Sequence, residues 1–179
     1  MKNRLHGRIV CWLLGVFFAL PASLSAAPVE ENALKAAFIY NFISFTEWPA
    51  GTFGAGGAIN LCADSRSPMA SSMAALNGKH IKAMRLNLHL LDSLQSDLSP
   101  CHILYIDRTD RQNWTPIKKK IDNASIITIS DDSEINASGV MIALSTLNNK
   151  IVFDIDMNVT QRARLAMSSK LLRLARTVR

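Results

Sequence analysis

Few side chains in this sequence have the types and spacing that catalysis or metal binding requires. His80, His89 and His102 lie in or beside expected strands without the spacing of metal ligands. The glycines in residues 51–57 precede an expected strand, whereas a phosphate-binding loop follows a strand and opens a helix. The sequence contains no glycine–x–serine–x–glycine elbow for a nucleophilic serine. These patterns predict a protein that is not an enzyme and that binds no metal or cofactor.

An acidic run at residues 131–139 has some features of a calcium-binding loop. Oxygen-bearing side chains alternate along it from Asp132 to Ser138. However, Ala137 stands where such a loop needs a glycine, and Ala143 stands where it needs a bidentate glutamate. We therefore expect a solvated loop at this position.

Two carboxylates share one face of the expected strand at residues 150–157. Because side chains alternate along a strand, Asp154 and Asp156 project to one side and Ile155 projects to the other. One interpretation is that the pair binds a basic partner, or binds the ammonium group of a small ligand with an aromatic residue such as Trp48 beside it. The other is a charged sheet edge that discourages aggregation.

The first 26 residues have the pattern of a secretory signal peptide. A basic start at residues 2–8 precedes an apolar run at residues 9–20 and then small residues, and we expect cleavage near Ala26. The apolar run is shorter than the roughly 20 residues that a membrane-spanning helix needs. Cleavage would lower the formal net charge from +6 to +3, which is too small to indicate nucleic-acid binding. The expected product, residues 27–179, is one exported domain that is not inserted in the membrane.

Export bears on the cysteines as well. Cleavage removes Cys11 and leaves Cys62 and Cys101, and an even pair in an oxidising compartment is typical of a disulfide. The bond would close a loop of about 40 residues and stabilise the fold by about 4 kcal/mol in the chain-entropy model. A structural staple is favoured over a reactive or redox-sensing pair.

The hydrophobic pattern predicts an α/β fold in a single three-layer domain. Strands alternate with helices, which is typical of a mostly parallel sheet flanked by helices, and a hairpin across Asn148 and Asn149 adds an antiparallel edge. The expected helices span residues 32–49, 67–76, 112–122 and 159–178, and the expected strands span 58–63, 84–91, 102–106, 125–129, 139–145 and 150–157.

The first and last helices have more apolar residues than one buried face needs. On the first, Ile39 and Ile43 lie nearly opposite the main apolar stripe. On the last, Leu165 and Leu172 lie outside both the inner stripe and the arginine-rich face. These four residues either form a surface for a protein partner or a second copy of the chain, or pack inside the domain.

Several segments together resemble the YfiR family of bacterial periplasmic proteins. These are KAAFIYNFISFTEWP at residues 35–49, HILYI at 102–106, GVMIAL at 139–144 and the closing stretch at 150–176. Two features depart from the family pattern. The phenylalanine–glutamate–isoleucine–asparagine signature is Phe153-Asp154-Ile155-Asp156 here, and the second cysteine pair of some members is missing.

The resemblance implies a regulator. YfiR-like proteins are similar in being periplasmic repressors that bind the outer portion of an inner-membrane diguanylate cyclase, with an outer-membrane lipoprotein as a further partner. Repression lowers cyclic-di-GMP and biofilm formation. An alternative function is a periplasmic binding module that senses a small molecule through Asp154, Asp156 and Trp48 and acts on another membrane signalling partner.

Overall fold

The computed structural model describes residues 27–54 and 57–179, with side chains from residue 31 onward. The expected signal peptide, residues 1–26, lies outside the described residues. Within the described ranges, no helix is both long enough and apolar enough to cross a membrane.

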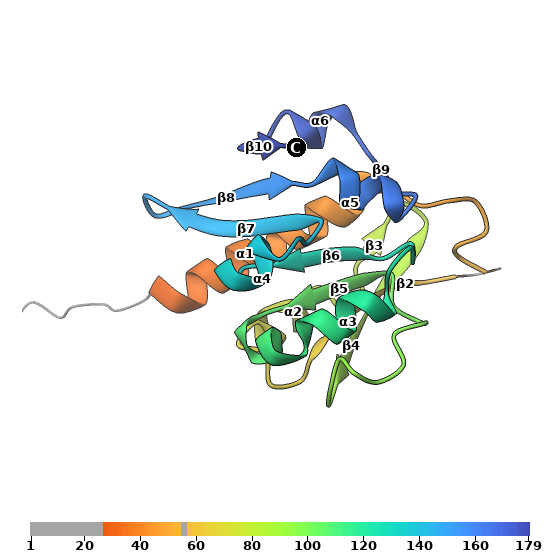
Figure 1. Ribbon diagram of the computed structural model, residues 1–179, viewed down its shortest axis with the longest axis horizontal. Helices are drawn as coiled ribbons and strands as arrows, with labels where there is room; N and C mark the ends of the chain where they lie inside the picture. Colours follow the sequence, from red (N-terminus) through yellow and green to blue (C-terminus); the bar gives the residue numbers. More distant parts are fainter. Residues whose placement is uncertain (1–26, 55–56) are drawn as a thin grey trace, which may run out of the picture.

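Eight strands form the central sheet: β2 (Ile59–Asp64), β3 (His80–Ile81), β4 (Met84–Leu91), β5 (Ile103–Ile106), β6 (Ile127–Ser130), β7 (Ile142–Leu147), β8 (Lys150–Ile155) and β10 (Thr177–Val178). Their spatial order is β10–β8–β7–β6–β5–β2–β4–β3 (Figure 1). β2, β4, β5, β6 and β7 run parallel, and β8 runs antiparallel to β7. The predicted mostly parallel sheet with an antiparallel hairpin is confirmed.

The direction of the chain through the sheet reverses at β2. β4 lies on one side of β2 and β5 on the other, so the chain first crosses from β2 to β4 and then crosses back from β4 past β2 to β5. In open α/β sheets, a crevice for ligands forms outside the carboxyl ends of the strands at such a point. Asp64 ends β2 and Asp107 follows β5, which places both side chains there.

Helices cover both faces of the sheet and give the predicted three layers: α1 (Ala27–Ser44), α2 (Ala70–Ala74), the 3-10 helix η1 (Arg108–Asn113), α3 (Trp114–Lys120), α4 (Ser133–Ala137), α5 (Met157–Arg162) and α6 (Ser169–Leu172). In Figure 1, α3 and α4 lie in front of the sheet and α1 lies behind it. Each face has its own apolar core. α1 and α2 contribute to one core, whereas α3 and α4 contribute to the other.

α1 is the most deeply buried helix of the domain. Ile39 and Phe42 are fully buried, and the Phe42 ring meets the Phe153 ring of β8 edge-on at 4.8 Å between centroids. The helix ends at Ser44, earlier than the predicted end at Pro49. It ends there because Thr46 and Glu47 form β1, which pairs with β9 (Ala166–Met167) in a separate two-stranded sheet.

The prediction of one closing helix at residues 159–178 is wrong. The chain folds into α5, β9, α6 and β10 instead, with left-handed backbone at Arg164 (φ 58°) between the first two. The apolar residues do recur at helical spacing. However, the segment forms strands instead, because β9 pairs with β1 and β10 pairs with β8. In one continuous helix, Leu174 and Val178 would have faced the core. In the observed structure both are exposed.

The predicted hairpin turn is present, whereas the predicted solvated loop is partly helical. Asn148 and Asn149 both have left-handed backbone (φ 49° and 59°), as a two-residue type I′ hairpin requires, so the predicted hairpin is confirmed. The segment expected as a solvated loop at residues 131–139 contains α4. Asp132 begins that helix by accepting backbone hydrogen bonds from Glu134 and Ile135.

Candidate functional site

Acidic side chains gather where β2, β5 and β6 end. Because these strands are parallel neighbours, their carboxyl ends meet at one edge of the sheet. Asp64 is the last residue of β2, Asp107 follows β5, and Asp131 and Asp132 follow β6. A cavity of about 260 Å³ opens at this edge. Besides three of these carboxylates, its wall contains Asn32, Met69, Tyr105 and Arg108.

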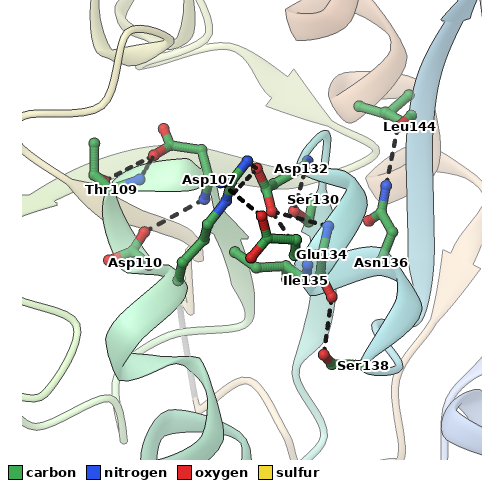
Figure 2. Close-up of polar contacts among 11 residues, drawn as sticks. Asp107, Thr109, Asp110, Ser130, Asp132, Glu134, Ile135, Asn136, Ser138 and Leu144 are labelled. Atoms are coloured by element: carbon green, nitrogen blue, oxygen red, sulfur yellow. Dashed lines mark hydrogen bonds and ion pairs between the residues drawn. The ribbon is translucent and has the colours of Figure 1, made fainter.

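Asp107 joins two of the segments that form the cavity. One carboxylate oxygen of Asp107 accepts hydrogen bonds from the backbone N–H (2.8 Å) and the hydroxyl (2.7 Å) of Thr109 (Figure 2). Through the first of these bonds, Asp107 caps the start of η1. The other accepts a 2.5 Å hydrogen bond from the Ser67 hydroxyl, in the segment after β2. Asp110 completes the capping box, and its burial raises the pKa of that carboxyl to about 6.

Asp132 links η1 to α4. The Arg111 guanidinium donates two hydrogen bonds to it (2.8 and 2.5 Å) and forms a 2.8 Å ion pair with Glu134. Figure 2 shows Asp132 and Glu134 side by side at the start of α4. Burial by itself would raise the pKa of Asp132, but the Arg111 guanidinium and the backbone N–H groups of Ile135 and Glu134 lower it. The carboxylate is therefore held in its ionised form.

Lys35 connects α1 to the same edge. Its ammonium group lies 2.7 Å from Asp131 and 2.9 Å from Glu31. Burial would lower the pKa of Lys35, but hydrogen bonds to Asp131 and Glu31 outweigh it and raise that pKa. Both a buried ammonium and a carboxylate that receives it are therefore part of this site.

Asp64 is paired within its own turn. The Arg66 guanidinium and backbone N–H donate hydrogen bonds of 2.7 to 2.9 Å to its buried carboxylate. The Arg66 hydrogen bonds outweigh burial and lower the pKa of Asp64.

The predicted disulfide between Cys62 and Cys101 is present. Cys62 lies in β2, and Cys101 lies just before β5, so the bond joins neighbouring strands with a Cα–Cα distance of 5.8 Å. Both residues are buried. The disulfide therefore joins β2 and β5, and the segments that follow these two strands contribute to the wall of the cavity.

Of the two interpretations of the four apolar residues Ile39, Ile43, Leu165 and Leu172, the structure supports packing inside the domain for three. Ile39, Ile43 and Leu165 are buried in the core shared by α1 and the closing segment, and Leu172 is partly buried against it. The side of α1 that carries Ile39 and Ile43 packs on this core, whereas Ala33, Ala37 and Asn41 lie on its exposed side. Ile39, Ile43 and Leu165 hold the domain together.

Asp154 and Asp156 have partners within the chain. Asp154 forms an ion pair with Arg176, and Asp156 lies 3.5 Å from Arg179 while its side chain begins α5. The Arg176 hydrogen bond outweighs burial and lowers the pKa of Asp154. The closing segment folds back as β10 and places both arginines on the β8 edge. The alternating pattern of β8 is as predicted, but the basic groups on these carboxylates come from the same chain.

Trp48 lies beside a different hollow. Its indole N–H donates to the Ser125 carbonyl (3.1 Å), and its ring packs on Phe53 with 5.5 Å between centroids. A groove of about 300 Å³ lies here, with Ile81 and Met84 in its wall. Neither Asp154 nor Asp156 lines this groove, so the structure does not bring the predicted sensing residues together.

Analysis of the sequence missed the acidic edge. A signal was present, because Asp64 and Asp107 directly follow expected strands and Asp131 lies two residues after another. Among the described side chains, no three His, Cys, Asp or Glu residues gather in an arrangement that would hold a metal ion.

Comparison with solved structures identifies similar folds. A conserved domain protein from Vibrio cholerae O1 biovar El Tor str. N16961 superposes with a TM-score of 0.53 at 8% identity over 83% of this chain. The match covers 60% of that protein, so the present chain spans less than two thirds of its length. An ABC domain in complex with L-Trp from Streptococcus pneumoniae gives a TM-score of 0.48 at 8% identity, over 68% of this chain and 56% of that one. The first likeness supports the α/β fold alone.

Comparison of sequences gives a more specific result. No curated protein matches the chain. A family profile described as YfiR/HmsC-like matches residues 32–176. The match begins in α1 and ends just before β10, so it includes both cysteines and the acidic edge.

Proposed function

The chain belongs to the YfiR/HmsC-like family, and on this premise we propose that it is a periplasmic regulator that binds and represses an inner-membrane diguanylate cyclase. Repression lowers cyclic-di-GMP and biofilm formation, and an outer-membrane lipoprotein is the proposed second partner. The family match carries the proposal, because it spans nearly the whole described domain. The proposed role needs no active site in this chain, in keeping with the sequence patterns.

Repression of this kind is a matter of differential affinity. A regulator that binds the inactive state of the cyclase more tightly shifts its population toward that state. Shifting the population from 1:99 to 99:1 requires a preference of about 5.5 kcal/mol. A few buried apolar anchors at an interface supply free energies of this size.

The closing segment offers the proposed contact surface. Leu174 is 71% exposed and Val178 is 44% exposed, although both are large apolar residues. They lie at the β10 edge of the sheet, beyond the partly buried Leu172. This surface replaces Ile39, Ile43 and Leu165 as the proposed contact, because those three residues are buried in the core.

Deleting the gene and measuring intracellular cyclic-di-GMP tests the proposal. In a cell that expresses both this protein and a candidate cyclase, we expect cyclic-di-GMP to rise and then to fall when the wild-type protein is restored. Leu174→Asp should fail to restore the low level. Leu90→Asp is the matched control, because Leu90 is also exposed (43%) but lies on β4, near the opposite edge of the sheet.

Three outcomes separate the possibilities. An unchanged cyclic-di-GMP level after deletion contradicts repression. Equal restoration by both variants places the contact on another surface. If wild-type protein elutes as a dimer and Leu174→Asp elutes as a monomer, the surface pairs two copies of this chain instead.

The Trp48 groove favours a second candidate function. Its apolar wall and its volume of about 300 Å³ suit a small aromatic ligand, which would make the protein a sensing module for another membrane signalling partner. Titration with benzyl alcohol should then shift the backbone amide signals of Ile81 and Met84 in a saturable way. The absence of saturable shifts in these signals would exclude such a site.

A further inference from the structure

The acidic edge is negative within a chain of positive net charge. The whole sequence has 14 acidic residues and a formal net charge of +6. Half of those acidic residues lie around the cavity, most of them in separate ion-paired groups, together with four basic residues. The acids are Glu31, Asp64, Asp107, Asp110, Asp131, Asp132 and Glu134, and the bases are Lys35, Arg66, Arg108 and Arg111. A small cation is therefore favoured over an anion here.

A buried phenol hydroxyl in this cavity has no hydrogen-bond partner. Tyr105 lines the cavity and is 1% exposed, yet its Oη makes no well-formed hydrogen bond with any described residue. Burial raises the pKa of the phenol, and the charge and proximity of the Asp131 carboxylate raise it further, so Oη keeps its proton. Leaving a buried hydroxyl unpaired costs about 1–3 kcal/mol, and a ligand is one reason to retain it.

Asp131 has acceptor capacity to spare. Its Oδ2 accepts from the Lys35 ammonium at 2.7 Å, while its Oδ1 accepts no hydrogen bond from the described part of the chain. Asp132 differs, because both of its oxygens are occupied by Arg111 and the first turn of α4. Lys35 shows that this carboxylate accepts an ammonium group.

The size of the cavity limits the ligand. Its volume of about 260 Å³ lies below the usual range for drug-sized ligands, which begins at about 300 Å³. An ammonium group has three donors and no acceptor. We propose that this cavity binds a small primary amine as its ammonium ion, which donates hydrogen bonds to Asp131 Oδ1 and Tyr105 Oη.

Through this site the domain would respond directly to a small amine. The proposal depends on neither the cyclase nor the β10 surface. The amine would lie between the end of β5 and the start of α4, and the Arg111 ion pairs already join α4 to η1, the element that follows β5. The purified protein alone is therefore sufficient for the test. Failure of the cyclic-di-GMP experiment would leave the binding result unaffected.

The test is an NMR titration of the isotope-labelled mature protein with ethylammonium chloride at constant ionic strength. Ethanol and acetate are the neutral and anionic probes of similar size. We expect saturable shifts of the backbone amide signals of Tyr105, Asp107 and Asp131 with ethylammonium alone. If ethylammonium gives none, or if acetate gives equal or larger shifts, the proposal is overturned.

Tyr105→Phe removes only the unpaired hydroxyl. Because no hydrogen bond to another residue is lost, the variant should fold at least as stably as wild type while binding ethylammonium about tenfold more weakly. Tyr40→Phe is the matched control, since the Tyr40 hydroxyl donates to the His80 carbonyl away from the cavity. Equal weakening by both substitutions, or none by Tyr105→Phe, would contradict a contact at Tyr105 Oη. The probe comparison in wild type decides the question even if a variant does not fold.

Discussion

The disulfide between Cys62 and Cys101 gives the most quantitative prediction. The bond closes a loop with a sequence separation of 39 residues. In the chain-entropy model, a loop of this length stabilises the folded state by about 4 kcal/mol, because the cross-link restricts the unfolded chain. Whole domains are stable by only about 5–15 kcal/mol, so loss of the bond should lower stability severely.

The assay is urea unfolding of the mature protein followed by circular dichroism. Wild type with and without reductant isolates the bond, because no atoms other than hydrogen change. The double variant Cys62→Ala, Cys101→Ala should lose slightly more stability, since both sulfur atoms are buried and their removal leaves unfilled space. The dependence of the unfolding free energy on urea should also steepen as the unfolded chain expands.

Two results would refute this reasoning. A loss below about 1 kcal/mol on reduction would show that the unfolded chain is already restricted, contrary to the loop-closure model. Alkylation of two thiols without reductant, detected by mass spectrometry, would show that Cys62 and Cys101 are not paired in the mature protein.

Two further predictions concern buried groups. Asp110 has a pKa of about 6 in the folded protein against 3.8 as its ordinary value, so the unfolded state binds fewer protons between these values and stability should fall as pH rises from about 4 to 6. Its contribution to that fall is roughly 3 kcal/mol, and Asp110→Asn should remove it from a plot of unfolding free energy against pH; an unchanged plot would contradict the raised pKa. Leu165→Asp should destabilise the domain by about 3–5 kcal/mol in urea unfolding, because it places a charge in the core. Leu174→Asp, at an exposed position, should change stability by less than about 0.5 kcal/mol, and similar losses for the two variants would contradict the assigned burial.

The fold class was predictable where local pattern and final environment agree. The strand predicted at residues 102–106 is present as β5, and its four residues are all buried, in keeping with their uninterrupted apolar run. The paired asparagines in the hairpin turn need left-handed backbone, which asparagine tolerates. The two cysteines of the expected mature chain allowed a single pairing, and the structure contains it.

The closing segment shows where a local pattern is insufficient. Apolar residues recur at helical spacing from Ala163 to Val178, but a periodic pattern does not reveal which strands need a partner. β1 and β8 each had an unpaired side, and the chain satisfied their backbone groups with β9 and β10. For this reason Leu165 became buried and Leu174 became exposed.

The sequence by itself determined the alternation of strands and helices, the hairpin turn, the pair of cysteines and the position of an aspartate directly at or after each of three strands. Only the tertiary structure decided that those strands are neighbours. Lys35, Tyr105 and Asp131 are separated by long stretches of chain, and they meet because β5 and β6 are adjacent and α1 crosses beside their carboxyl ends. Strand order depends on how the whole sheet buries its two faces, a property that no local segment encodes.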